Sequence, residues 1–302
     1  MSFEIIITFL KPIAHLLKSQ SISEIMVNPD GSVWIEDAGR VQPCSDIHFD
    51  EGALLTGLEV IANRFGKKLD ADSPIMNLRL PDGSRLAAII PPVVNPHPLM
   101  TVRRFTARNF TLDDLIKTGM LTNEQASVLT AAVRDGKNVL IAGATSTGKT
   151  TLAGVLADAI PERDRILLIE DTAELHIRKP HVVSAESQTD THRSRITFDD
   201  LLTAILRHRP DRIIVGEVRG PEARTLLDAM NTGHRGTLAT IHASSADEAI
   251  HRVATLVMRG SSGLSLDAVK DDVRRGINLI VHIQREQGRR RIQEILDLAP
   301  HP

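Results

Sequence analysis

Residues 138–151 read Asn-Val-Leu-Ile-Ala-Gly-Ala-Thr-Ser-Thr-Gly-Lys-Thr-Thr. The apolar run 139–142 predicts a buried strand, and the apolar spacing over 152–160 predicts a helix directly afterwards. Between them, residues 143–150 match Gly-x-x-x-x-Gly-Lys-Thr at every fixed position. Glycines let consecutive N–H groups turn toward one phosphate, and a helix N-terminus adds unpaired donors. The stretch therefore predicts a nucleotide-binding loop on an α/β sheet, formed by Gly143, Ala144, Thr145, Ser146, Thr147, Gly148, Lys149, Thr150 and Thr151.

The two most reactive side chains of this loop have separate expected roles. Lys149 is expected to contact the β- and γ-phosphates, and the Thr150 hydroxyl is placed to bind Mg²⁺. The predicted cofactors are therefore a nucleoside triphosphate and Mg²⁺.

Downstream of the loop, short apolar runs alternate with helical patterns. Strands are predicted near 166–169, 212–215, 237–241 and 279–283, and helices near 197–207, 221–231, 245–258 and 266–275. This alternation predicts a largely parallel sheet with helices on both faces. The chain is expected to end in a hairpin that turns at 287–288.

The first third of the chain predicts a smaller mixed α/β domain over residues 1–105. A hairpin is expected around the turn 28–31, and a helix near 51–65. Helical spacing over 4–18, interrupted by Pro12, fits a helix packed on this domain or one lying in a membrane interface. We expect a linker over 106–121 and a second domain over 122–302, whose first helix opens with a capping box at Thr122.

Two acidic residues follow predicted strands of the second domain. The strand 212–215 leads to Gly216 and Glu217, where many phosphate-loop enzymes place an aspartate that acts through Mg²⁺. The strand 166–169 leads to Glu170. Carboxyl ends of strands face the ligand crevice in such sheets, so Glu170 and Glu217 are candidates to offset Mg²⁺ or activate water. Each is also compatible with an ordinary surface role.

A histidine, His242, follows the strand predicted over 237–241. At a strand end beside the loop, its ring is placed to donate to a phosphate or to an acid, and so to respond to the γ-phosphate. An isolated histidine at a strand end is equally compatible with a structural role.

Composition argues against a chain that coats nucleic acid. The 302 residues carry a net charge of −2, and only 3% are aromatic, which is a poor basis for stacking bases. Of the 36 basic residues 27 are arginine, which suits phosphate and carboxylate partners or reflects genomic composition. The single cysteine, Cys44, indicates a reducing compartment. We find no apolar run of the ~20 residues that a spanning helix needs and expect a cytoplasmic chain.

Four segments, in order, resemble the type II/IV secretion ATPase superfamily. GATSTGKTT, IEDTAEL, LRHRPDRIIVGEVRG and TGHRGTLATIHA correspond to its Walker A, Asp box, Walker B and His box. The resemblance is strong over about 138–260 and extends into the first domain through EIMVNPDGSVWIED, PDGSRLAAIIPPV and TVRRF. The lack of a cysteine-rich zinc insertion favours the VirB-type branch with conjugal transfer proteins. This resemblance implies a RecA-like P-loop ATPase domain behind a smaller N-terminal domain.

The resemblance also implies roles for individual residues. Glu170 acts in the Asp box, Glu217 positions or activates water, and both join Thr150 around the metal. His242 senses the γ-phosphate. Two arginines of the first domain, Arg85 and Arg103, reach the γ-phosphate, and Arg209 reaches a site across a subunit interface.

The implied assembly is a homo-hexameric ring that hydrolyses ATP and moves its two domains against each other. Its implied partners are inner-membrane channel proteins of conjugation or secretion, with peripheral association at the inner membrane and no sequence-specific nucleic acid. A basic cluster at 289–291 fits a solvated hairpin or an attraction to anionic lipid. The alternatives are a helicase-like nucleic-acid motor, a scaffold that binds but does not hydrolyse ATP, and a pilus retraction motor of the same superfamily.

Overall fold

The computed structural model describes residues 3–19, 21–37, 39–104, 110–171, 173–187, 196–259, 263–286 and 288–298. The chain divides into two compact units, Met1–Arg108 and Asn109–Pro302. Residues 106–109 of the predicted linker lie outside the described residues. Its remainder forms α3 (Leu112–Lys117), whose Leu115 is buried in the core of the second unit.

The first unit is an antiparallel sheet with helices on one face. Its strands are β1 (Ile22–Val27), β2 (Ser32–Asp37), β3 (Arg40–His48), β4 (Ile75–Arg79), β5 (Arg85–Ile89) and β6 (Leu99–Arg103), ordered β3-β2-β1-β6-β5-β4. The chain begins with α1 (Phe3–Phe9) and the short 3-10 turns η1 (Lys11–Ile13) and η2 (Leu16–Lys18), and α2 (Glu51–Arg64) follows β3.

The pattern over 4–18 therefore predicts helical structure correctly but not one helix. Pro12 lies at the start of η1, where its missing N–H ends the α-helical bonding. Ile6, Leu10 and Leu17 are fully buried in the core of this unit, so these side chains are not available to a membrane interface.

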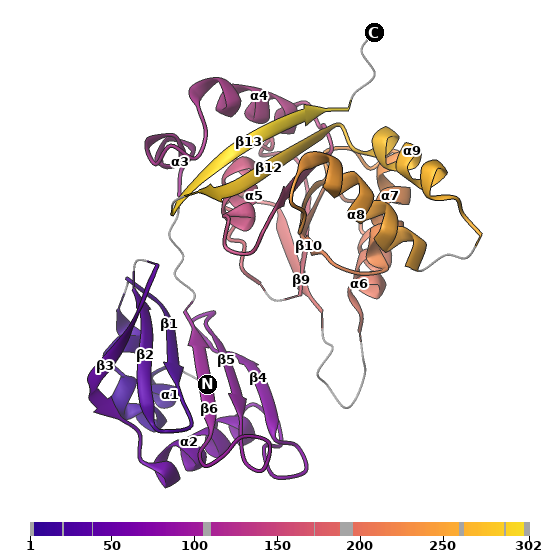
Figure 1. Cartoon of the computed structure of the whole chain (residues 1–302). Helices are drawn as coiled ribbons and strands as arrows, with labels where there is room; N and C mark the ends of the chain where they lie inside the picture. Colours follow the sequence, from indigo (N-terminus) through magenta and orange to yellow (C-terminus); the bar gives the residue numbers. More distant parts are fainter. Residues whose placement is uncertain are drawn as a thin grey trace. The chain divides into compact units, whose positions relative to one another are not determined.

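The second unit is the predicted parallel sheet (Figure 1). Its strands are β7 (Val139–Gly143), β8 (Ile166–Glu170), β9 (Val182–Glu186), β10 (Arg212–Val218), β11 (Leu238–Ile241), β12 (Leu279–Glu286) and β13 (Arg289–Asp297). Their order is β13-β12-β7-β11-β10-β8-β9, and only β13 runs antiparallel to its neighbour among these strands. The carboxyl ends of β7, β8, β10 and β11 therefore meet at one edge.

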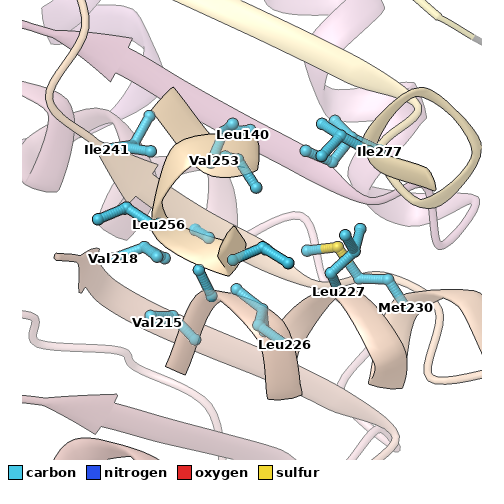
Figure 2. Packing of buried hydrophobic residues seen from close by; sticks show 14 of the residues in the cluster. Leu140, Val215, Val218, Leu226, Leu227, Met230, Ile241, Val253, Leu256 and Ile277 are labelled. Atoms are coloured by element: carbon cyan, nitrogen blue, oxygen red, sulfur yellow. The ribbon is translucent and has the colours of Figure 1, made fainter. Parts of the chain in front are cut away.

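Alternate residues of these strands serve two separate cores. On one face, Leu140, Val215 and Ile241 pack against α6 (Phe198–Ile205), α7 (Glu222–Asn231), α8 (Ala246–Arg259) and α9 (Leu266–Gly276). Figure 2 shows Val253 and Leu256 of α8 among these strand residues and the side chains of α7. On the other face, Val139 and Ile141 pack against α3, α4 (Asn123–Arg134) and α5 (Lys149–Ala157).

Two of the strands that the sequence analysis does not predict, β3 and β9, lie at sheet edges. Along β3, seven of nine residues are exposed and Pro43 interrupts the run. In β9 no residue is fully buried. Exposed edge strands carry little hydrophobic alternation, which is the signal that identifies a strand in a sequence.

A buried arginine ties the amino end of β10 to α4. Arg212 Nε donates to Asp164 Oδ2 at 2.7 Å, while its two terminal nitrogens donate to the Val133 and Arg134 carbonyls at 2.9 and 3.2 Å. A cation at the end of a helix also interacts favourably with the helix dipole. A Cβ on Gly236 would overlap the guanidinium, so this position needs glycine.

Replacing Arg212 tests the strength of this tie. Arg212→Met leaves the largely buried Asp164 without its partner and should lower the free energy of unfolding of the second unit by about 3–4 kcal/mol. Urea unfolding followed by circular dichroism measures it, while fluorescence of Trp34 reports the first unit, which should not change. The control Arg275→Met removes an exposed pair with Asp272 and should cost less than about 1 kcal/mol. Equal losses would contradict the assignment.

Candidate nucleotide site

The loop 143–150 has the local geometry of a phosphate cradle. It joins the carboxyl end of β7 to the first turn of α5, and Gly148 at the helix N-cap has a φ of 95°. Ser146 also has a positive φ, 61°, a conformation that glycine adopts without strain and serine does not. Because Gly148 has no side chain to cap the helix, backbone N–H groups of the first turn stay available for an anion.

Gly143 is required by its surroundings. A Cβ there would lie 2.5 Å from the Ile283 carbonyl oxygen and 2.7 Å from Thr147 Oγ1. The loop can therefore start only with glycine at this close approach to β12.

Lys149 is held within the loop that it is expected to serve. Its Nζ donates to the carbonyls of Gly143 and Ala144, each at 2.9 Å, and the residue is buried. Burial lowers the pKa of Lys149, and the nearby Glu217 carboxylate opposes that effect. A phosphate would offer the ammonium a stronger, charged acceptor than the two carbonyls.

Glu217 lies beside this lysine in a network of charged groups. The guanidinium of Arg219 donates two hydrogen bonds to the Glu217 carboxylate, from Nε to Oε1 and from Nη2 to Oε2, each 2.8 Å long. His242 Nε2 lies 2.9 Å from the same Oε1. Burial disfavours the carboxylate, but the bonds and charge of Arg219 outweigh it, with smaller contributions from His242 and Lys149, so the pKa of Glu217 lies below its usual range.

His242 is therefore a donor in this network. Burial and the charge of Lys149 lower its pKa despite the neighbouring carboxylate, so the ring is neutral at pH 7. A neutral ring next to an ionised oxygen donates through Nε2–H. The prediction that His242 contacts an acid agrees with this geometry.

Glu170 occupies a different environment, at the end of β8 beside Gly216 of the neighbouring β10. Its Oε1 accepts the N–H groups of Glu174 and Leu175 at 2.9 and 3.0 Å. Its Oε2 is buried and has no hydrogen-bond partner among the described residues. Burial raises the pKa of Glu170 to about 7, although the two backbone bonds oppose the shift.

Gly216 makes room for this side chain. A Cβ at Gly216 would lie 2.9 Å from Glu170 Cγ, so an aspartate could not stand there without displacing Glu170. This close approach explains why glycine occupies the position at which many phosphate-loop enzymes have an aspartate.

The predicted arginines lie in two places. Arg85 of β5 and Arg103 of β6 are paired directly across neighbouring strands of the first unit, on the face opposite its core. Arg209 precedes β10 with a φ of 52°, at the amino ends of the parallel strands, and lies 3.6 Å from Asp211 Oδ2. Within the second unit it is therefore at the opposite edge of the sheet from the loop.

Sequence reasoning missed one member of the site, Arg219. Its position two residues after Glu217 places it on the same side of the extended chain, which was the available signal. It also lies 3.3 Å from Asp171 Oδ2, so it joins the segment after β8 to the segment after β10.

The oxygen ligands that Mg²⁺ prefers are present at this edge. Thr150 lies in the first turn of α5, and Glu217 carries an ionised carboxylate within electrostatic reach of Lys149. Glu170 is a poorer fit, because one oxygen is engaged by two backbone donors and its raised pKa disfavours the charged form.

The model of the Type II/IV secretion system protein family matches residues 8–289. The chain belongs to this family of secretion ATPases. It is 35% identical to a probable conjugal transfer protein TrbB of Sinorhizobium fredii, covering 93% of this chain and 85% of that protein. It is 32% identical to the type IV secretion system protein VirB11 of Bartonella quintana, covering 96% and 92%.

Solved structures share the fold. The pilus retraction motor PilT with bound ADP superposes with a TM-score of 0.68 at 20% identity, covering 97% of this chain and 82% of that one. The VirB11 ATPase of Brucella suis gives 0.54 at 24% identity, covering 97% and 94%. The chain therefore has an N-terminal domain and a RecA-like ATPase domain, as the sequence resemblance implied. No helix in the described part of the chain has the length and apolar character needed to cross a bilayer.

The raised pKa of Glu170 links stability to pH. Below about pH 4.5 the folded and unfolded chains both hold this proton. Between about 4.5 and 7 the unfolded chain releases it while the folded chain keeps it, so the free energy of unfolding falls as pH rises, by up to about 3 kcal/mol. The neutral Glu170→Gln still accepts both backbone bonds and should gain stability over the parent from pH 5 to pH 8.

Urea unfolding at several pH values, without nucleotide, measures that difference. Glu162→Gln, at an exposed position before β8, is the matched control and should follow the parent. A difference between Glu170→Gln and the parent that stays constant from pH 5 to pH 8 would show that Glu170 is not protonated in the folded state.

Proposed function

We propose that this protein hydrolyses ATP in a Mg²⁺-dependent reaction and, as a homo-hexameric ring, powers conjugative transfer, type IV secretion or pilus assembly. One observation carries the proposal: Lys149 of the phosphate loop and the Glu217 carboxylate interact electrostatically at one edge of the parallel sheet. The similarity to TrbB and VirB11 over more than nine-tenths of the chain supports the setting in conjugation or secretion.

In this proposal the loop N–H groups and Lys149 bind the β- and γ-phosphates. Thr150 and Glu217 hold Mg²⁺, which when bound neutralises charge that develops on the phosphates. Lys149 exchanges its two carbonyl acceptors for phosphate oxygens, so the ammonium is already positioned before the nucleotide arrives.

Glu217 is the residue that orients the attacking water. It is ionised, and Arg219 and His242 fix the direction of its carboxylate. Glu170 serves a different purpose. It accepts the backbone N–H groups of Glu174 and Leu175, and its side chain packs against Gly216 of β10. His242 donates to Glu217 and is placed to respond when a γ-phosphate draws that carboxylate away.

The remaining arginines complete the proposed cycle. Arg85 and Arg103 contribute positive charge from the first domain, and Arg209 contributes it to a neighbouring subunit. A group of this kind is worth about 10³–10⁵ in rate in well-studied phosphoryl transfer. Loss of the γ-phosphate then releases the first domain, and the domain motion does work on inner-membrane channel proteins.

Three substitutions test the assignment of the site. Lys149→Ala should abolish phosphate release and nucleotide binding while the circular dichroism spectrum is retained. Glu217→Gln should bind a non-hydrolysable ATP analogue normally but lower kcat by at least about 100-fold, within the range reported for a group that stabilises the transition state. Glu170→Gln, which keeps its backbone bonds, should lower kcat by a smaller factor. Parental turnover by Lys149→Ala would refute the site, and a larger loss in Glu170→Gln would reverse the two glutamates.

The ring is tested by size. Light scattering of the parental protein with and without a non-hydrolysable ATP analogue and Mg²⁺ should reveal a hexamer in at least one condition. Arg209→Gln should lower turnover only in the assembled form, because its partner site lies in another subunit. A protein that is strictly monomeric under both conditions would contradict the ring.

A further inference from the structure

The C-terminal hairpin of β12 and β13 contacts the phosphate loop at both ends and at its crest. At the start of the loop, Ile283 of β12 pairs with Gly143 of β7, and its carbonyl oxygen would lie 2.5 Å from a Cβ on that glycine. At the end of the loop, a Cβ on Gly148 would lie 3.4 Å from Arg290 Cδ and 3.3 Å from Met120 Cε. The hairpin therefore fixes the space that the loop occupies.

The contact at the crest is a hydrogen bond. Arg290 Nε donates to the carbonyl oxygen of Ser146 at 3.1 Å. Ser146 is the loop residue with a φ of 61°, a backbone conformation that is unfavourable for a residue with a side chain. A bond from a cation to this carbonyl is suited to hold the peptide in the strained orientation.

Arg290 is itself held in place by the strand that carries it. Along β13, Arg290 and the buried Ile292 point to the same side, whereas Arg289 and Arg291 point to the other. Ile292 pairs with Ile283 across the hairpin, and its N–H donates to the Met120 carbonyl at 2.8 Å. The backbone that presents Arg290 is thus anchored on both sides.

We propose that Arg290 is a positioning residue for nucleotide binding: it holds the phosphate loop in its binding conformation through the Ser146 carbonyl. The inference rests on the proposed function, because it assigns this residue to the same nucleotide site. A loop already held in its bound shape loses less conformational freedom when phosphate binds. The basic cluster 289–291 is therefore not uniform: one of its three arginines serves the loop, and the other two do not.

The test measures affinity for ADP and for inorganic pyrophosphate by calorimetry on the full-length protein. Arg290→Gln should weaken both by a similar factor, about three- to tenfold, because both ligands use the loop and pyrophosphate has no base. Arg290→Lys should weaken them similarly, because lysine keeps the charge but not the Nε–H donor. Arg289→Gln and Arg291→Gln remove the same charge from the opposite side and should stay within about twofold of the parent.

Several outcomes would overturn the proposal. If Arg290→Gln binds both ligands with parental affinity, Arg290 does not position the loop. If it binds ADP more weakly but pyrophosphate as the parent does, Arg290 contacts the base or ribose instead. Retained affinity in Arg290→Lys, or an equal loss in Arg289→Gln, makes the effect one of charge alone. If the nucleotide-free Arg290→Gln and Arg290→Lys proteins unfold at a lower thermal midpoint, and this destabilisation accounts for their loss of ligand affinity, the role of Arg290 is merely structural.

The same measurement separates this inference from the proposed function. If the parental protein binds neither ligand, or Lys149→Ala binds both as the parent does, the nucleotide site itself is wrong. If the parent binds and Lys149→Ala does not, the site holds and only the comparison of the hairpin variants decides the role of Arg290.

Discussion

The site depends on the parallel alignment of β7, β8, β10 and β11, which brings four carboxyl ends to one edge of a sheet. The phosphate loop leaves β7 there, and Glu170, Glu217 and His242 each stand at or just beyond the end of another strand. The two apolar cores above and below the sheet fix this register. Charged groups that are scattered over a hundred residues of sequence thus meet without needing an apolar pocket of their own.

Two glutamates at that edge show how environment divides roles between identical side chains. Glu170 is buried against Gly216, and this burial favours the protonated form even though its Oε1 accepts two backbone N–H groups. Glu217 faces Arg219, His242 and Lys149, which favour the carboxylate. A sequence pattern treats both as acids that follow a strand. Only their neighbours in the fold distinguish the buried carboxyl of Glu170 from the ionised carboxylate of Glu217.

The sequence predicted what is encoded locally. The strand and helix on either side of residues 144–148, the alternation of strands and helices and the capping box at Thr122 depend on residues close together in the chain, and the structure confirms them. The edge strands β3 and β9 were missed because neither alternates buried and exposed residues, which is the pattern that identifies a strand. Arg219 and Arg290 were not assigned for another reason: each bonds to a group that is distant in the sequence. Arg219 contacts Asp171, 48 residues away, and Arg290 contacts Ser146, 144 residues away.

The central claim is that this sheet edge binds a nucleoside triphosphate with Glu217 beside the reacting phosphate. Determining the structure of the protein with Mg²⁺ and a non-hydrolysable ATP analogue tests it most directly. The account predicts that Lys149 Nζ leaves the Gly143 and Ala144 carbonyls for the β- and γ-phosphates, and that Glu217, not Glu170, is the carboxylate nearest the water in line with the γ-phosphate. An analogue bound away from residues 143–150, or a water held by Glu170 alone, would contradict it.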